Sequence, residues 1–188
     1  MSAQNIDAAR EALFGDALAC DTVMPAALRA DAPDTRTIER AVDHAEVVLR
    51  SLAMIEDSPH EDIDEHGNHD ACLARVEAKL NLVLETLSGI LRRDRADLPL
   101  QPVRWSRHGA VLQHSGEPPG RGFLVVQPIA WVPQRLELPV RLLASEAQGN
   151  GQHRVWLRFE PQPATLENAL EKHLFRLHRR QLAHRKPA

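Results

Sequence analysis

Two segments in the first half of the chain carry apolar residues at alternating intervals of three and four. The stripe in residues 36–57 consists of Ile38, Ala41, Ala45, Val48, Leu52 and Ile55, and the stripe in residues 70–93 consists of Leu73, Val76, Leu80, Val83, Leu87 and Ile90. This spacing predicts two amphipathic helices. Asp34 or Thr35 is the expected N-cap of the first, and the arginines at the end of the second suit a helix C-terminus.

The second stripe has the form of a heptad seam. With Leu73, Leu80 and Leu87 at position a, the β-branched residues Val76, Val83 and Ile90 fall at position d. Leucine at a with β-branched residues at d disfavours a parallel dimer and favours higher orders. The first helix keeps the same register, so the two stripes could bury each other within one chain. However, further leucines widen the apolar arc beyond what one partner helix covers, namely Leu82, Leu84 and Leu91.

We therefore predict self-association, with a tetramer as the favoured homo-oligomer. A trimer, or packing of the extra face on the rest of the chain, is the alternative. The residues expected to carry assembly are Ile38, Ala45, Val48, Leu52, Ile55, Leu73, Val76, Leu80, Val83, Leu87 and Ile90.

The pattern changes after residue 97. Segments 103–113, 122–131, 135–147 and 153–160 read as strands separated by Gly- and Pro-rich turns, which is typical of a small antiparallel barrel or sandwich. A weaker strand pattern lies between Gly15 and Pro25. A closing helix over residues 165–182 has Leu166, Leu170, Leu174 and Leu177 on one face. The predicted fold class is α+β.

Composition and charge narrow the function classes. The chain has 188 residues, 43% of them hydrophobic, and a net charge of −3, which gives no overall preference for nucleic acid. The two cysteines form neither a disulfide framework nor a zinc quartet and suit reduced thiols in a cytoplasm. No apolar run approaches the roughly 20 residues that span a bilayer. We expect a soluble cytoplasmic protein without membrane insertion.

The segment "VRWSRHGAVL" resembles the strand–turn–strand signature of the PilZ family, in which an Asp or Asn precedes Ser-x-x-Gly. Ser106 and Gly109 match it, whereas Arg104 stands in the place of the acid or amide. The Pro-rich turn and strand "PPGRGFLVV" and the basic closing helix "LEKHLFRLHRR" also resemble the family. The resemblance implies a six-stranded barrel that typically receives cyclic di-GMP.

The inserted helices resemble an atypical PilZ branch of xanthomonads, whose members assemble as tetramers through such helices. The resemblance implies three parts: an N-terminal segment (1–33) that could supply the first barrel strand, a two-helix heptad insertion (34–93), and a PilZ-like barrel with its closing helix (97–188). The implied setting is cyclic di-GMP-related signalling.

The residues argue against tight binding of this dinucleotide. PilZ receptors hold the phosphates with an Arg-x-x-x-Arg motif ahead of the barrel and the guanine edge with the Asp or Asn. Arg104 has no acceptor atom to offer guanine. Arg36 with Arg40, and Arg176 with Arg180, match the arginine spacing, but both pairs fall in predicted helices away from its place. Arg104, Ser106 and Gly109 are thus a degenerate ligand site.

Other constellations are weaker. Loop 58–72 is rich in His, Asp and Glu, but an EF-hand reading fails because Leu73 stands where the bidentate glutamate belongs, and a solvated acidic loop is favoured over a metal site. No phosphate loop, His-Glu-x-x-His or Gly-x-Ser-x-Gly motif indicates an enzyme. We predict a non-enzymatic oligomeric scaffold or adaptor with an unknown partner protein and no cofactor. A cyclic di-GMP receptor with non-standard arginines and a nucleic-acid-binding module based on the basic C-terminal helix are the alternatives.

Overall fold

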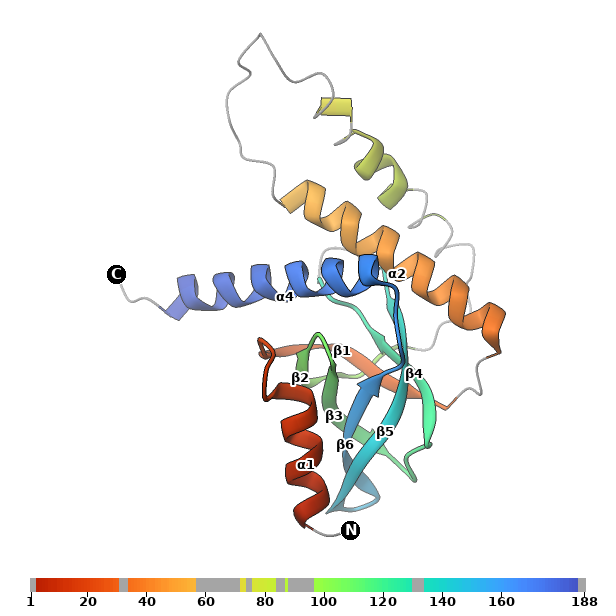
Figure 1. Cartoon of the computed structure of the whole chain (residues 1–188), viewed down its shortest axis with the longest axis vertical. Coiled ribbons are helices and arrows are strands. Elements are labelled where there is room, and N and C mark those ends of the chain that lie inside the picture. The colour runs from red at the N-terminus through yellow and green to blue at the C-terminus, as the bar shows by residue number, and fades with distance from the viewer. Residues whose placement is uncertain are drawn as a thin grey trace.

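The computed structural model describes residues 3–30, 34–56, 72–73, 76–83, 87, 97–129 and 134–185. Six antiparallel strands close into a barrel in the order β1-β2-β3-β6-β5-β4 (Figure 1). The α+β class and the antiparallel six-stranded sheet predicted from the sequence are confirmed. The strands are β1 (Cys20–Arg29), β2 (Leu100–Ser106), β3 (Gly109–Ser115), β4 (Arg121–Val126), β5 (Leu136–Gly149) and β6 (Gln152–Phe159).

Strand β1 closes the barrel by changing partners at Pro25. Residues 20–25 pair with β2 and residues 26–29 pair with β4. The predicted strand between Gly15 and Pro25 therefore continues past the proline. Buried Gln101 supports the change, because its Nε2 donates to the Ala26 carbonyl at 2.6 Å and its Oε1 accepts from the Gln113 N–H at 2.9 Å. Long-range pairing and a buried amide thus override a local strand-ending signal.

An N-terminal helix, α1 (Ala3–Phe14), was not predicted from the sequence. It packs on β5, β6 and β2. Ala9 and Leu13 are buried with Ala144 and Trp156 in a satellite core, and Ile6 packs against its edge. The spacing of Ile6, Ala9 and Leu13 fits one face of a helix and was the available signal.

The β2–β3 turn holds the end of α1. The Ser106 hydroxyl is fully buried, donates to the Leu13 carbonyl at 2.6 Å and accepts from the His108 N–H at 3.0 Å. A Cβ at Gly109 would overlap the Leu157 carbonyl oxygen and approach Leu13 Cδ2 to 2.8 Å. Because the neighbour at Gly109 is backbone, it cannot move aside. Ser106 therefore holds the end of α1 through a hydrogen bond, and the absence of a side chain at Gly109 lets Leu13 and β6 pack closely against the turn.

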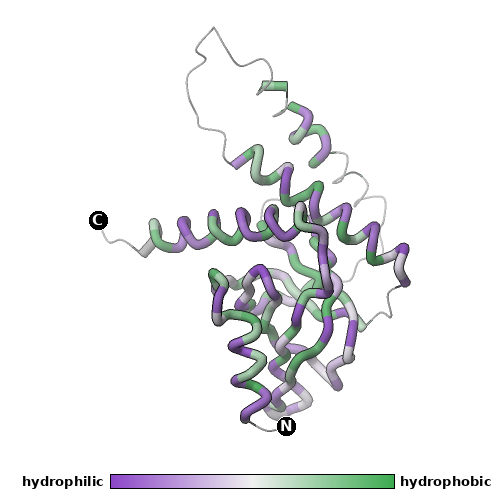
Figure 2. The backbone as a smooth tube through the Cα atoms, in the orientation of Figure 1, coloured by the Kyte–Doolittle hydropathy of each residue, from purple (hydrophilic) through white to green (hydrophobic). Residues whose placement is uncertain are grey.

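Helix α2 (Thr35–Glu56) follows β1 in the chain and packs on β5 and α4. Asp34 is its N-cap, as predicted, since its Oδ1 accepts from the Thr37 N–H at 2.7 Å. This hydrogen bond lowers the pKa of the Asp34 carboxyl. Hydrophobic and hydrophilic residues alternate along α2 in Figure 2, as an amphipathic helix requires. Its buried face joins the main core through Val42, Ala45, Val48, Leu49 and Leu52.

Residues 72–73, 76–83 and 87 are helical in the part of the second predicted helix that the structure describes. Ala78 is buried and Leu82 packs against the main core, so this helix touches the rest of the chain through these two residues. Figure 1 shows it beside α2, on the side away from the barrel.

Helix α4 (Ala164–Arg185) crosses between the barrel and α2 (Figure 1). Leu166, Leu170 and Leu174 are buried, as the predicted leucine face requires. His173 lies on the same face, with its ring edge-on to Trp105 at a centroid distance of 5.8 Å. Burial, and then the charges of Arg176 and Arg180, lower the pKa of His173 to about 3.

An ion cluster joins the C-terminal end of α2 to the middle of α4. Glu56, at the end of α2, lies 3.1 Å from Arg176 Nε and 2.6 Å from Arg180 Nη2, and its side chain is 8% exposed. A buried carboxylate needs such partners to offset its desolvation. The cluster therefore fixes the C-terminal end of α2 against the middle of α4.

We expect stability to fall in acid because of His173. The unfolded histidine binds a proton near pH 6.5, whereas the folded one stays neutral down to about pH 3. Unfolding is therefore favoured as pH drops through this window, by about 2 kcal/mol at pH 5 relative to pH 7.5. Urea unfolding of wild type and His173→Phe at both pH values measures it, with His178→Phe on the same helix as control. An equal loss in wild type and His173→Phe would contradict this assignment.

Replacing Ser106 by Ala should destabilise the fold in the absence of any ligand. The change strips the Leu13 carbonyl and the His108 N–H of their buried partner, which costs about 1–3 kcal/mol. Ser115→Ala on β3 is the matched control, because its hydroxyl contacts Gln152 at an exposed position. Denaturant midpoints compare the two. Unchanged stability in Ser106→Ala would show that the hydroxyl is not what holds α1.

Candidate functional site

The signature residue Arg104 contacts two other groups of the chain, while its side chain stays 52% exposed. Its Nη1 lies 3.6 Å from Asp21 Oδ2, and its guanidinium lies 5.1 Å from the centroid of the Phe14 ring. Arginine donates only, and a carboxylate and an aromatic face of the same chain receive it. Sequence reasoning placed Arg104 with Ser106 and Gly109, and the structure brings all three to the β2–β3 hairpin next to α1.

A groove of about 670 Å³ runs beside Arg104 on the outside of the barrel. It combines arginines with two aromatic rings, a mixture that suits a flat anionic ligand. It also contains Asp21, which already pairs with Arg104. The residues that define its chemistry are Arg10, Phe14, Asp21, Arg104, Arg154 and Trp156.

The arginine pairs with receptor-like spacing are placed elsewhere. Arg36 and Arg40 are exposed in the first turns of α2. Arg176 and Arg180 both contact Glu56, so an internal carboxylate uses the charge that a phosphate would need. Neither pair lies with Arg104 in the groove. The two ion pairs also reduce the cationic surface that the C-terminal helix offers to nucleic acid.

The heptad seam of the second helix is exposed along its described length. Its side chains retain between 51% and 66% of their accessible surface, a large apolar fraction for a soluble protein. The residues are Leu73, Val76, Leu80, Val83 and Leu87. Ile90, the sixth predicted member, lies outside the described residues, as do Leu84 and Leu91. Val47 and Met54 of α2 are 40% and 42% exposed and had no place in the predicted seam.

The stripe of α2 behaves differently from that of the second helix. Ala45 and Leu52 are 0% exposed and Val48 is 1% exposed, all within one chain, while Ile38 and Ile55 are half-buried. Within one chain, Ala45, Val48 and Leu52 therefore belong to the main core, and Ile38 packs against it. The two predicted seams do not bury each other: α2 turns its stripe to the barrel and α4, and the second helix turns its seam outward.

The remaining candidates from the sequence are the clustered His, Asp and Glu side chains and the two cysteines. No group of three or more His, Cys, Asp or Glu side chains in the described ranges could hold a metal ion. Most of the acidic loop 58–72 lies outside those ranges. Cys20 and Cys72 are free thiols. No helix in the described part of the chain has the length and hydropathy of a membrane span.

Comparison with known proteins identifies the family. Residues 49–186 match the family described as "Atypical PilZ domain, cyclic di-GMP receptor". A solved Xanthomonas campestris protein, described as a tetrameric PilZ domain self-assembled via an unusual helical bundle, is 39% identical; the match covers 97% of this chain and 99% of that one, with a TM-score of 0.73. No curated protein matches the sequence. The chain belongs to the atypical PilZ domain family, whose setting is cyclic di-GMP signalling.

Proposed function

We propose that this chain is a non-enzymatic, cytoplasmic scaffold or adaptor that self-assembles through its second helix, and that it does not bind cyclic di-GMP tightly. The observation that carries the proposal is the row of leucines and valines left exposed on that helix. A monomer gains nothing from holding these side chains in water at the spacing of a coiled-coil seam.

The second helix has one face in contact with its own chain and another face that stays exposed. The second helix contacts its own chain through Ala78 and Leu82. Leu80 and Val83 lie outside that contact and are 55% and 52% exposed. Leucine at a with β-branched residues at d favours more than two strands. The Xanthomonas relative is described as a tetramer built through a helical bundle, which supports the same form here.

The signature residues of this chain are unsuited to tight cyclic di-GMP binding. Arg104 supplies no acceptor and already faces Asp21. The Ser106 hydroxyl is committed to the backbone of α1 and of the β2–β3 turn. A dinucleotide at this turn would have to compete with α1. Self-association would then gather several barrels, and each would present a surface to an unknown partner protein.

A second candidate function is a cyclic di-GMP receptor with non-standard arginines. The groove lined by Arg10, Arg104 and Arg154 supports this alternative, because it joins guanidinium groups to the Phe14 and Trp156 rings. The family description supports it as well. A nucleic-acid-binding role has less support, since Arg176 and Arg180 are paired with Glu56.

Leu80→Asp with Val83→Asp should convert the assembly to monomers. Each carboxylate would have to be buried in an apolar interface, at a cost of several kcal/mol per site. Light scattering gives the molar mass, and circular dichroism checks the fold. Leu182→Asp on α4, where the leucine is also 51% exposed, is the matched control and should keep the wild-type mass. A wild-type chain that is already monomeric at high concentration would refute the proposal.

Isothermal titration with cyclic di-GMP separates the adaptor from the receptor. We expect no binding below micromolar concentrations, because the acceptor for guanine is missing at Arg104. Submicromolar binding would overturn this expectation. If it occurs and is lost in Arg10→Gln or Arg154→Gln, the groove is the receptor site.

A further inference from the structure

Three arginines lie side by side across neighbouring strands of the barrel. Arg121 of β4 is the ladder partner of Arg141 of β5, and Arg141 is the ladder partner of Arg158 of β6. Directly opposite residues share one face of the sheet with Cβ atoms about 4.5–5.5 Å apart. Like charges in this arrangement destabilise a sheet. Three arginines in one row therefore destabilise the sheet unless another interaction offsets their repulsion.

One arginine of the row is neutralised within the chain. Arg121 Nε lies 3.4 Å from Glu160 Oε1. Arg141 and Arg158 have no ion pair with a carboxylate in the described part of the chain. Arg154, four residues earlier on the same strand, does have one, at 3.8 Å from Glu146. Arg141 and Arg158 are therefore the two arginines of the row that lack a carboxylate partner among the described residues.

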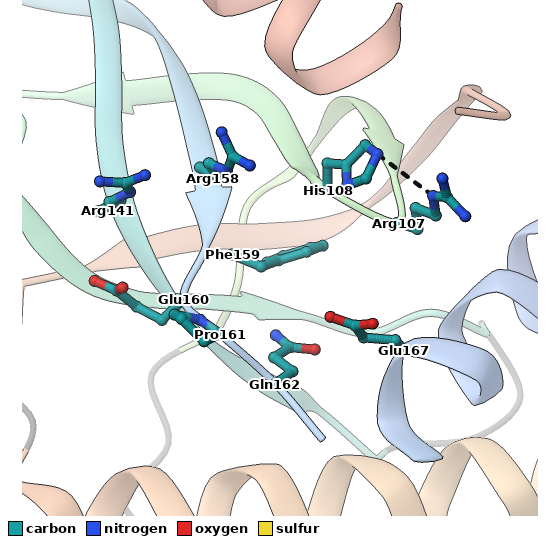
Figure 3. A pocket seen from close by; sticks show the side chains of 9 residues that line it. All are labelled: Arg107, His108, Arg141, Arg158, Phe159, Glu160, Pro161, Gln162 and Glu167. Carbon is teal, nitrogen blue, oxygen red and sulfur yellow. Dashed lines mark hydrogen bonds between the residues drawn. The ribbon is translucent and has the colours of Figure 1, made fainter. Parts of the chain in front are cut away.

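The unmatched arginines line a cavity of about 330 Å³, drawn in Figure 3. This volume is at the lower end of the range for small-molecule sites. Arg141 and Arg158 stand next to each other on one side, and Gln162 and Glu167 lie across from them, with the Phe159 ring between (Figure 3). Glu167 comes from the first turn of α4.

A second feature of this cavity also indicates a missing acceptor. The Nε2 atom of Gln162 is buried and has no hydrogen-bond partner among the described residues. An unsatisfied buried donor costs about 1–3 kcal/mol. A ligand oxygen beside Gln162 would supply its acceptor after a small rotation of the side chain.

We propose that this cavity binds the phosphate group of a small-molecule ligand. The guanidinium groups of Arg141 and Arg158 donate to its oxygens, and Gln162 donates a further hydrogen bond. Paired arginines are the protein groups best matched to phosphate geometry. The cavity borders the β2–β3 turn through Arg107 and His108 but contains neither Arg104 nor Ser106, and the proposal requires neither assembly through the second helix nor cyclic di-GMP binding.

The test uses the full-length chain and pyrophosphate as the probe, in a zwitterionic buffer with potassium chloride matched in ionic strength. We expect pyrophosphate to raise the thermal midpoint of the wild type more than chloride does. Arg158→Gln and Arg141→Gln should each weaken pyrophosphate binding at least tenfold in titration calorimetry. Arg50→Gln, which removes the same charge at an exposed position of α2 outside the cavity, should bind as the wild type does.

A second readout separates this site from a purely structural role. Without ligand, Arg158→Gln should melt at or above the wild-type temperature, because it removes a like-charge contact. Guanosine monophosphate and orthophosphate serve as further probes: tighter binding of the nucleotide assigns the ligand to that class, and equal binding assigns recognition to the phosphate alone. No wild-type response beyond chloride, or equal losses in Arg50→Gln and Arg158→Gln, would overturn the proposal.

Discussion

The packing of α2 against its own barrel and α4 is the interaction on which the rest of the molecule depends. Val48, Leu49 and Leu52 are almost completely removed from solvent there. Each such side chain contributes roughly 1.5–3 kcal/mol by burial. Withdrawing α2 to join a bundle would forfeit these contacts. Because α2 is packed in this way, the next helix contacts the rest of the described chain through Ala78 and Leu82. The described residues of its seam stay exposed.

The ion cluster at Glu56 adds direction to that packing. Apolar burial alone tolerates sliding and rotation of one helix on another, whereas a buried carboxylate between two guanidinium groups fits one arrangement. Arg176 and Arg180 thereby fix where α2 ends on α4. Neutral His173 lies one turn before Arg176 on the buried face, and a proton there would add a third positive charge to the same region. The ion cluster therefore acts together with the apolar packing to orient α2 on α4.

The sequence predicted most of the strands, α4 and the capped start of α2 because each has a clear local signal, whereas the pattern for β1 was weak and stopped at Pro25. It failed where periodicity does not identify the partner. A heptad pattern in α2 is the same whether Ala45 and Leu52 face a second copy or the chain's own barrel, and only the closed sheet decides between them. Helix α1 was missed because its stripe is short and rich in alanine. Its anchor, the hydrogen bond from Ser106 to Leu13, joins residues far apart in sequence.

The degenerate site could be predicted only in part, for a related reason. The missing acceptor at Arg104 is evident from the residue type alone. The use of Ser106 and Gly109 is not, because the same two residues suit a ligand-binding turn and a turn that holds a helix. The Gln162 and Arg158 cavity could not be predicted as a unit, since its members come from the β2–β3 turn, β5, β6, the segment before α4 and the first turn of α4. Only the strand register places Arg141 opposite Arg158.

The β2–β3 turn gives Ser106 and Gly109 a structural role that does not depend on a ligand. Replacing Gly109 would push a Cβ into the backbone of β6, and replacing Ser106 would leave polar groups of α1 and the turn unpaired. Both positions are therefore constrained by the architecture itself. The Arg104 position faces solvent, Asp21 and an aromatic ring, and a change there leaves the Ser106 hydrogen bonds and the packing at Gly109 in place. A barrel with these constraints tolerates an arginine in place of the acid or amide and keeps the rest of the turn, which leaves its fold intact.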